Sequence, residues 1–198
     1  MMAVGRPDLR VVREPEEQPP AVPSAVLAMI LFVGVEMMMF AAFISAHAIG
    51  RANMVEWPPP GQPRLPIETT AFNTLVLLAS GVAMRYAGRL FDDGKVESSF
   101  KVLLGALGTG AFFLVFQGYE WSRLIAEGLA FRGTPYGGFF YLIVGAHALH
   151  AIVGLMGVVW MVARLRTASL SREAFLAGRL YWYFVVALWP VLYWRVYL

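Results

Sequence analysis

The sequence of 198 residues contains no cysteine and few charged side chains. The absence of cysteine excludes disulfide bonds, cysteine-ligated zinc, iron–sulfur clusters and a cysteine nucleophile. Only 15% of the residues are charged, against about 25% in an average soluble domain, while 59% are hydrophobic. A single soluble core of this size could not bury so much apolar sequence, so we expect a polytopic membrane protein.

The sequence also lacks the clusters of side chains that usually mark an active site. We find no Ser–His–Asp set, no phosphate-binding loop and no carboxylate-rich metal cluster. The net charge is +3, but the basic residues are scattered at the ends of apolar segments, which argues against nucleic-acid binding. A hydrophobic bundle with a few buried polar groups is typical of a subunit that packs beside a catalytic one. We therefore predict no catalytic residue and no metal site in this chain.

Five apolar segments are long enough to cross a bilayer as helices. They cover residues 25–44, 71–90, 102–119, 136–163 and 180–197. We predict an all-α bundle of five transmembrane helices over residues 25–198. Residues 1–24 are polar and contain five prolines, so we expect a disordered cytoplasmic tail there. Small residues such as Ala106 and Gly110, or Gly154 and Gly157, would allow close contact between helices.

The basic residues predict the orientation of the chain in the membrane. If the N-terminus is cytoplasmic, eleven Lys and Arg residues lie inside and five lie outside. Because cytoplasmic loops carry an excess of Lys and Arg, this distribution favours an N-in, C-out topology.

Glu36 is the one formally charged residue in the first apolar segment, twelfth of its twenty residues. A carboxylate at that depth costs about 2.5–3.5 kcal/mol on insertion scales, so we expect it to face protein or water and not lipid. Two roles are open from the residues alone. Glu36 either exchanges a proton or pairs with a substrate, or it is a neutral, hydrogen-bonded carboxylic acid that fixes helix packing.

His147 and His150 lie three residues apart in the fourth segment, a spacing that places both rings on one face of a helix. Two histidines on one helix could bind a metal. A haem held from both sides, however, needs histidines on different helices, and the remaining histidine is His47. We therefore favour hydrogen bonds from His147 and His150 to Glu36 or to backbone carbonyls.

Four other residues are predicted to contact lipid or the membrane interface. Arg85 could reach a lipid phosphate by snorkelling, and Glu120 marks the end of the third segment. Trp57 is expected to be an interfacial tryptophan in a stiff, proline-rich loop, and Trp182 belongs to an aromatic cluster of the kind found at membrane interfaces. In the second segment, Asn73, Thr74 and Ser80 are expected to form interhelical hydrogen bonds.

Taken together in chain order, several motifs resemble subunit III of the haem-copper oxidases in its shorter, five-helix form. The matching pieces are Val35-Glu36 with Met39-Phe40, Trp57-Pro58-Pro59-Pro60-Gly61, Phe72-Asn73-Thr74, Gln117-Gly118-Tyr119-Glu120-Trp121, Gly145 to Gly154 with its two histidines, and Tyr181-Trp182-Tyr183 with Trp189. The resemblance covers the chain from about Ala25 to its C-terminus. Two positions depart from the family pattern, because Tyr183 stands where the family usually has histidine and Val186 where it has aspartate.

The resemblance implies a supporting role in a bacterial terminal oxidase that reduces dioxygen and pumps protons across the inner membrane. Subunit III of this family contains no haem or copper, which reside in partner subunits. It packs against subunit I, meets cytochrome c only through the complex with subunits I and II, holds structural phospholipid, and supports proton uptake. By position, Glu36 corresponds to the buried family glutamate, with His147 and His150 as its polar neighbours.

Three alternatives remain at this point. The chain could be the accessory subunit of a nitric oxide reductase or of a quinol oxidase, since the partner subunits decide the electron donor. It could also be an independent proton-coupled transporter that uses Glu36. A haem-binding cytochrome is the third alternative, which a visible spectrum would test.

Overall fold

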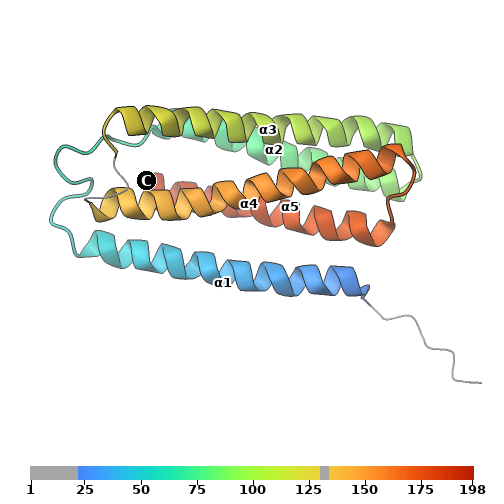
Figure 1. Ribbon diagram of the computed structural model, residues 1–198, viewed down its shortest axis with the longest axis horizontal. Coiled ribbons are helices and arrows are strands. Elements are labelled where there is room, and N and C mark those ends of the chain that lie inside the picture. Colours follow the sequence, from blue (N-terminus) through green and yellow to red (C-terminus); the bar gives the residue numbers. More distant parts are fainter. Residues whose placement is uncertain (1–21, 130–133) are drawn as a thin grey trace, which may run out of the picture.

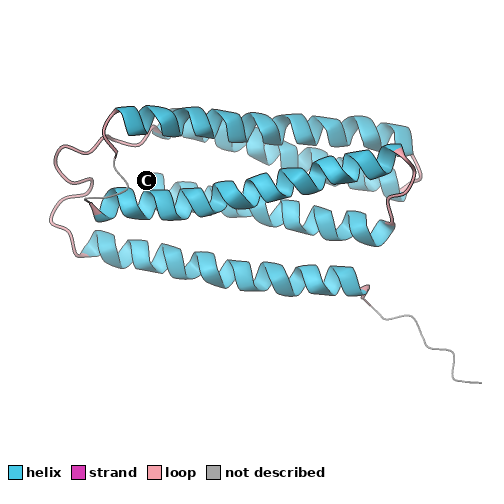
Figure 2. Cartoon of the chain, in the orientation of Figure 1, coloured by secondary structure: helices cyan, strands magenta, loops and turns pink. Residues whose placement is uncertain are grey.

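The computed structural model describes residues 22–129 and 134–198. The described part of the chain is helical and contains no strand (Figure 2). Its elements are α1 (Ser24–Ala52), α2 (Ile67–Asp92), α3 (Val96–Ala126), α4 (Pro135–Arg166), α5 (Arg172–Leu192) and a final π-helical turn, η1 (Tyr193–Tyr197). Five helices, the last running from Arg172 to Tyr197, are long and apolar enough to span a membrane, which confirms the predicted all-α, five-span fold. Residues 1–21 of the predicted tail lie outside the described residues.

Helices α2 to α5 form a bundle, and α1 packs against one side of it (Figure 1). Around the bundle, α2 contacts α3, α3 contacts α4, α4 contacts α5, and α5 contacts α2. Helix α1 packs against α4 and α5. One end of the bundle carries the α1–α2 loop and the C-terminus, and the opposite end carries the α2–α3 and α4–α5 connections (Figure 1).

The helices extend beyond the apolar segments that predict them, by up to eight residues at one end. The sequence supplies signals for these ends. Thr134 caps α4 by accepting a hydrogen bond from the Gly137 amide, with Pro135 in the first helical position. Ser171 caps α5 in the same way, through the Ala174 amide. Gly94 follows α2 with a φ of +75°, a backbone conformation that glycine adopts without steric cost.

Polar side chains on α2 accept hydrogen bonds from tryptophans on α5. The Trp182 indole nitrogen donates to Ser80 Oγ over 2.8 Å, and the Trp189 indole nitrogen donates to Thr74 Oγ1 over 2.9 Å. Asn73 donates to the Phe113 carbonyl on α3, 3.1 Å away. The predicted interhelical role of Asn73, Thr74 and Ser80 is confirmed. Since lipid offers no partner for an indole N–H, these bonds keep the large tryptophan rings inside the bundle.

Two glycines make room for Trp182, which is 1% exposed. A Cβ added at Gly110 on α3 would lie 2.7 Å from Trp182 Cζ2, and one at Gly154 on α4 would lie 2.9 Å from Trp182 Cε3. The predicted close contacts are therefore confirmed at Gly110 and Gly154. The prediction is wrong for Gly157, where a Cβ would meet nothing within 4 Å.

One departure from the family pattern, Val186, lies in a close contact between α5 and α2. Val186 is 6% exposed and faces Gly81 of α2, where an added Cβ would lie 2.9 Å from Val186 Cγ1. The α2–α5 contact at this position is therefore apolar and close. It leaves no space for a larger polar side chain on α2.

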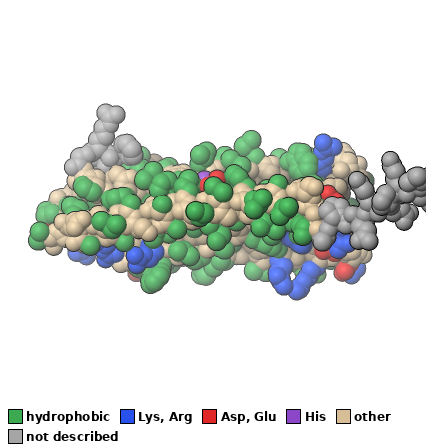
Figure 3. All heavy atoms as spheres, turned by 90° about the horizontal axis from the view of Figure 1, so that it is seen from below, with side chains coloured by type: hydrophobic (Ala, Val, Ile, Leu, Met, Phe, Trp, Pro, Cys, Tyr) green, Lys and Arg blue, Asp and Glu red, His purple; other side chains and the backbone are tan. Residues whose placement is uncertain are grey.

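The outer surface of the bundle matches a bilayer environment. Hydrophobic side chains dominate the middle of the face that carries α1, and Lys and Arg side chains lie toward its two ends (Figure 3). Several large apolar residues of α1 are exposed, among them Leu31, Val35 and Met38. The chain is a multi-pass membrane protein.

Candidate functional site

The carboxyl group of Glu36 and the ring of His150 meet in the gap between α1 and α4. Glu36 Oε2 lies 3.0 Å from His150 Nε2, and the two side chains are 16% and 12% exposed. Glu36 lies about 3 Å along the axis from the midpoint of α1, at 1.5 Å per residue. The pair therefore sits near the middle of the membrane-spanning part. This side-chain hydrogen bond joins α1 to α4.

The second ring nitrogen of His150 determines how many protons the pair holds. His150 Nδ1 lies 2.7 Å from the Ala146 carbonyl oxygen. A carbonyl only accepts, so Nδ1 carries a proton and donates it. The hydrogen bond to Glu36 then requires one more proton between Nε2 and Oε2. That proton makes the pair either neutral imidazole with carboxylic acid or imidazolium with carboxylate, and in both forms the pair has no net charge.

Aromatic rings surround the Glu36–His150 pair. Phe40 packs edge-on against His150 with ring centroids 5.2 Å apart, and Phe184 of α5 lies 6.2 Å away. Tyr181 donates its hydroxyl hydrogen to the His150 carbonyl over 3.2 Å. These contacts restrict the imidazole to the orientation that meets Glu36.

His147 does not join this pair. Its ring packs against Trp189 and Phe113 in the bundle interior, and neither ring nitrogen has a hydrogen-bond partner among the described residues. Residues three apart on an α-helix differ in direction by about 60°, enough to send His150 toward α1 and His147 toward α3 and α5. The structure thus brings one of the two predicted neighbours to Glu36.

Two of the four predicted lipid or interface contacts lie inside the protein. Trp182 is buried among the helices because glycines on α3 and α4 accommodate its ring and Ser80 accepts its N–H. Glu120 is 3% exposed and lies 3.7 Å from the Arg123 guanidinium, which is the charge that compensates it. For both residues the surface position predicted from sequence is wrong.

The other two predicted contacts remain near the surface. Arg85 is exposed on α2, and Arg89 lies exposed one turn further along the same helix. Trp57 is half-buried in the α1–α2 loop, where it packs edge-on against Tyr136 at 5.0 Å and against His47 at 5.3 Å. Trp57 thereby fixes the loop to the ends of α1 and α4.

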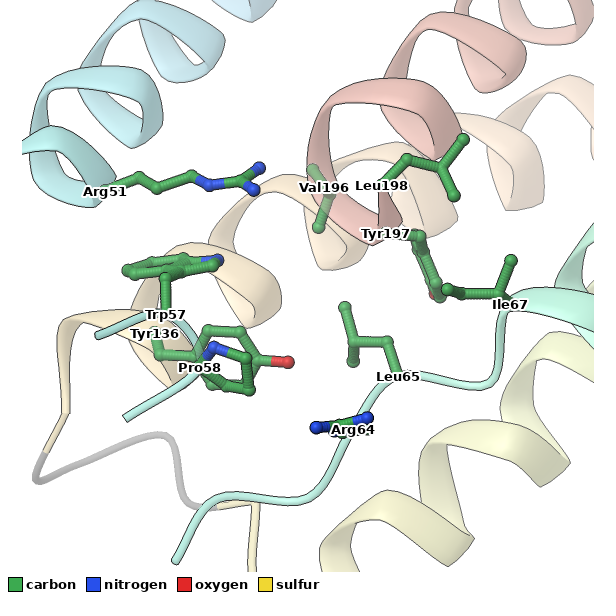
Figure 4. Close-up of a pocket in the computed structure, with 10 residues that line it drawn as sticks. All are labelled: Arg51, Trp57, Pro58, Arg64, Leu65, Ile67, Tyr136, Val196, Tyr197 and Leu198. Carbon is green, nitrogen blue, oxygen red and sulfur yellow. The ribbon is translucent and has the colours of Figure 1, made fainter. Parts of the chain in front are cut away.

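A cavity of about 150 Å³ lies at this end of the bundle, beside the C-terminus (Figure 4). Arg51 enters from α1 and Arg64 from the α1–α2 loop, and neither takes part in an ion pair among the described residues. The remaining lining residues are Trp57, Pro58, Leu65, Ile67, Tyr136, Val196, Tyr197 and Leu198. The cavity joins basic and aromatic side chains at the edge of the apolar region.

A buried polar chain next to this cavity extends the predicted role of Asn73 to Gln117 and Tyr197, which the sequence did not predict. Gln117 of α3 donates to the Tyr197 hydroxyl over 3.0 Å and accepts from Asn73 of α2 over 3.4 Å. It therefore links α2, α3 and the final turn of the chain. The available signal is that Asn73 and Gln117 are polar residues in otherwise apolar segments.

No group of three or more His, Asp or Glu side chains in the described ranges is arranged to hold a metal ion. The Glu36–His150 pair supplies two potential ligand atoms, and both are already engaged with each other. The chemistry that this arrangement supports is the holding of one proton at membrane depth.

Comparison with known proteins gives a consistent family assignment. Residues 20–198 match the family described as cytochrome c oxidase subunit III. A protein of Nocardia farcinica named probable cytochrome c oxidase subunit 3 is 29% identical, over 85% of this chain and 84% of that protein. The cytochrome c oxidase subunit 3 of Thermostichus vulcanus is 28% identical over 87% of this chain and 86% of its own length. The Mus musculus protein of that name is 32% identical over 85% of this chain and 67% of its own length.

Proposed function

The chain belongs to the cytochrome c oxidase subunit III family, and we propose that it is the accessory subunit III of a bacterial proton-pumping terminal oxidase. Membership of this family makes it a subunit of a complex with other oxidase subunits. In our proposal the partners are subunits I and II, which hold the haem and copper and receive electrons from cytochrome c. This chain then contributes structure and a polar environment and no redox centre.

The observation that carries the proposal is the Glu36–His150 pair. A carboxyl and an imidazole that share one proton near the membrane midplane have no net charge, so they do not require a counter-ion from lipid. The 3.0 Å hydrogen bond between Glu36 Oε2 and His150 Nε2 also connects α1 to the remaining helices. We propose that the pair maintains the position of α1 and the proton environment next to subunit I. Both roles support proton uptake without a catalytic step in this chain.

We further propose that the chain lies in the bacterial inner membrane with its N-terminus in the cytoplasm. The excess of Lys and Arg on the cytoplasmic side supports this orientation. The α2–α3 turn would then be cytoplasmic and the α1–α2 loop would be periplasmic, because these two connections lie at opposite ends of the bundle.

Structural phospholipid is the remaining part of the proposal. Arg85 and Arg89 are both exposed and lie one helical turn apart on α2, near its cytoplasmic end in this orientation. Two guanidinium groups at that spacing suit a lipid phosphate at the interface. Trp57 occupies the corresponding interfacial region at the other end of the bundle.

The decisive experiment is a mild-detergent affinity purification of the tagged chain from its native membranes. We expect subunits I and II to co-purify, with an a-type haem signal in the dithionite-reduced minus oxidised spectrum. A b- or c-type spectrum with a reductase partner would keep the family assignment and change the reaction. Co-purification of quinol oxidase subunits would keep the family assignment and change the electron donor. Recovery of the chain alone and colourless would contradict the proposal and make proton-coupled transport in liposomes the next assay.

A further inference from the structure

A second cavity, of about 230 Å³, lies between α3 and α4 and is separate from the Glu36–His150 pair. Its floor consists of buried residues, namely Phe113, His147 and Trp189. Its rim includes Gly118 and Ile152, which are exposed on the outer surface of the bundle. The cavity therefore opens through a surface that faces lipid when the helices span a membrane.

Buried polar atoms in this cavity lack partners. His147 is 1% exposed, and both of its ring nitrogens have no hydrogen-bond partner among the described residues. The Trp121 indole nitrogen, on a second lining residue, is also buried and without a partner there. Buried groups of this kind cost free energy unless a partner is supplied, so an occupant with hydrogen-bonding oxygen is favoured over a plain hydrocarbon.

The size and lining of the cavity restrict this occupant further. A cavity of roughly 150 Å³ is known to accept benzene, and a water molecule takes about 30 Å³, so this space exceeds the needs of either. Aromatic rings of Phe113, Trp121 and Trp189 line it, and the other lining side chains are Leu114, Gln117, Val144, Ala148 and Ile152. No Lys, Arg, Asp or Glu side chain is present to balance a charged ligand.

We propose that this cavity binds a neutral, membrane-soluble ring compound that carries a hydroxyl or carbonyl oxygen, the chemistry of a quinol or quinone headgroup. The ring packs among the aromatic residues, and its oxygen pairs with a nitrogen of His147. An attached hydrocarbon tail leaves through the rim at Gly118 and Ile152 into the lipid. The proposal concerns binding and includes no electron transfer.

The test is whether decylubiquinone binds to the purified full chain in detergent micelles. Binding is measured by quenching of tryptophan fluorescence and by equilibrium dialysis. We expect a saturable component above the linear partition into micelles. His147→Leu should weaken it about tenfold, the scale of one buried hydrogen bond. Absence of a saturable component, or unchanged affinity in His147→Leu, would overturn the proposal.

A second variant tests the site independently, in case His147→Leu does not fold. A Cβ at Gly118 would meet nothing within 4 Å, so Gly118→Phe should fold while its ring blocks the rim and abolishes saturable binding. Gly105→Phe is the matched control, since Gly105 is exposed on the same helix, has the same free space and lies outside the cavity. Equal affinity in the two variants would contradict the assigned site.

Competition distinguishes a ring compound from an acyl lipid. We expect methyl decanoate, which has an ester carbonyl and no ring, and decylbenzene, which has a ring and no oxygen, each to displace the quinone at least tenfold less well than unlabelled decylubiquinone. Displacement by methyl decanoate at equal concentration would identify the site as a lipid groove. Equal displacement by decylbenzene would show that the His147 hydrogen bond is irrelevant, and either result would refute the proposal.

Discussion

Glu36 of α1 and His150 of α4 are joined by a 3.0 Å hydrogen bond whose proton count is set by a third atom, the Ala146 carbonyl oxygen. Because His150 Nδ1 donates to that carbonyl, the Nε2–Oε2 contact holds one proton, and the pair as a whole is uncharged. This relationship explains how a glutamate is accommodated near the middle of a helix whose other side chains are largely exposed and apolar.

Replacement of Glu36 by glutamine should leave the subunit assembled in its complex. The glutamine amide donates N–H to His150 Nε2 as a carboxylic acid would, so the α1–α4 hydrogen bond is kept. Glu36→Leu removes the bond and should lower the recovery of the subunit. The measurement is the ratio of this chain to co-purified partner subunits. Loss of the subunit in Glu36→Gln would show that a negative charge is itself required.

A double-mutant cycle should detect the coupling between Glu36 and His150. We expect Glu36→Leu and His150→Leu each to destabilise the chain by about 1–2 kcal/mol, with the double variant less affected than the sum by about 0.6–1.7 kcal/mol. Apparent unfolding temperatures in detergent give the four values. Additive effects would mean that the hydrogen bond contributes nothing to stability.

The close packing around Trp182 predicts opposite effects on stability when two glycines of α4 are replaced by alanine. Gly154→Ala should destabilise the protein by about 1–3 kcal/mol, because the new Cβ would lie 2.9 Å from Trp182 Cε3. Gly157→Ala is the control, since its Cβ would meet nothing within 4 Å, and it should be neutral or stabilise by up to about 1 kcal/mol. Thermal unfolding of both variants in one detergent gives the comparison. A similar loss in both would indicate that helix backbone effects and not the tryptophan contact dominate.

The lack of cysteine allows a clean test of topology with single cysteine variants. Val55 in the α1–α2 loop and Asp93 in the α2–α3 turn are both exposed and lie at opposite ends of the bundle. With the N-terminus inside, a membrane-impermeant maleimide should label Val55→Cys in intact cells and Asp93→Cys only after the membrane is opened. The reverse pattern would contradict the N-in orientation.

Sequence alone determined the number and approximate place of the helices. Residues 25–44 and the four later apolar segments are long enough to span a bilayer, and hydrogen bonding within a helix satisfies the backbone that lipid leaves unpaired. The interhelical role of Ser80 also followed, because a hydroxyl inside an apolar segment needs a partner.

Tertiary structure decided which side chains meet. The i, i+3 spacing of His147 and His150 is compatible with one shared site, yet packing directs His150 to Glu36 and His147 to the α3–α4 cavity. Trp182 is aromatic like an interfacial residue, but the space left by Gly110 and Gly154 and the Ser80 acceptor bury it. The sequence pattern indicates which side of a helix faces its neighbours. The gaps between neighbouring helices then determine which residue each side chain contacts, and those gaps arise only when all five helices pack together.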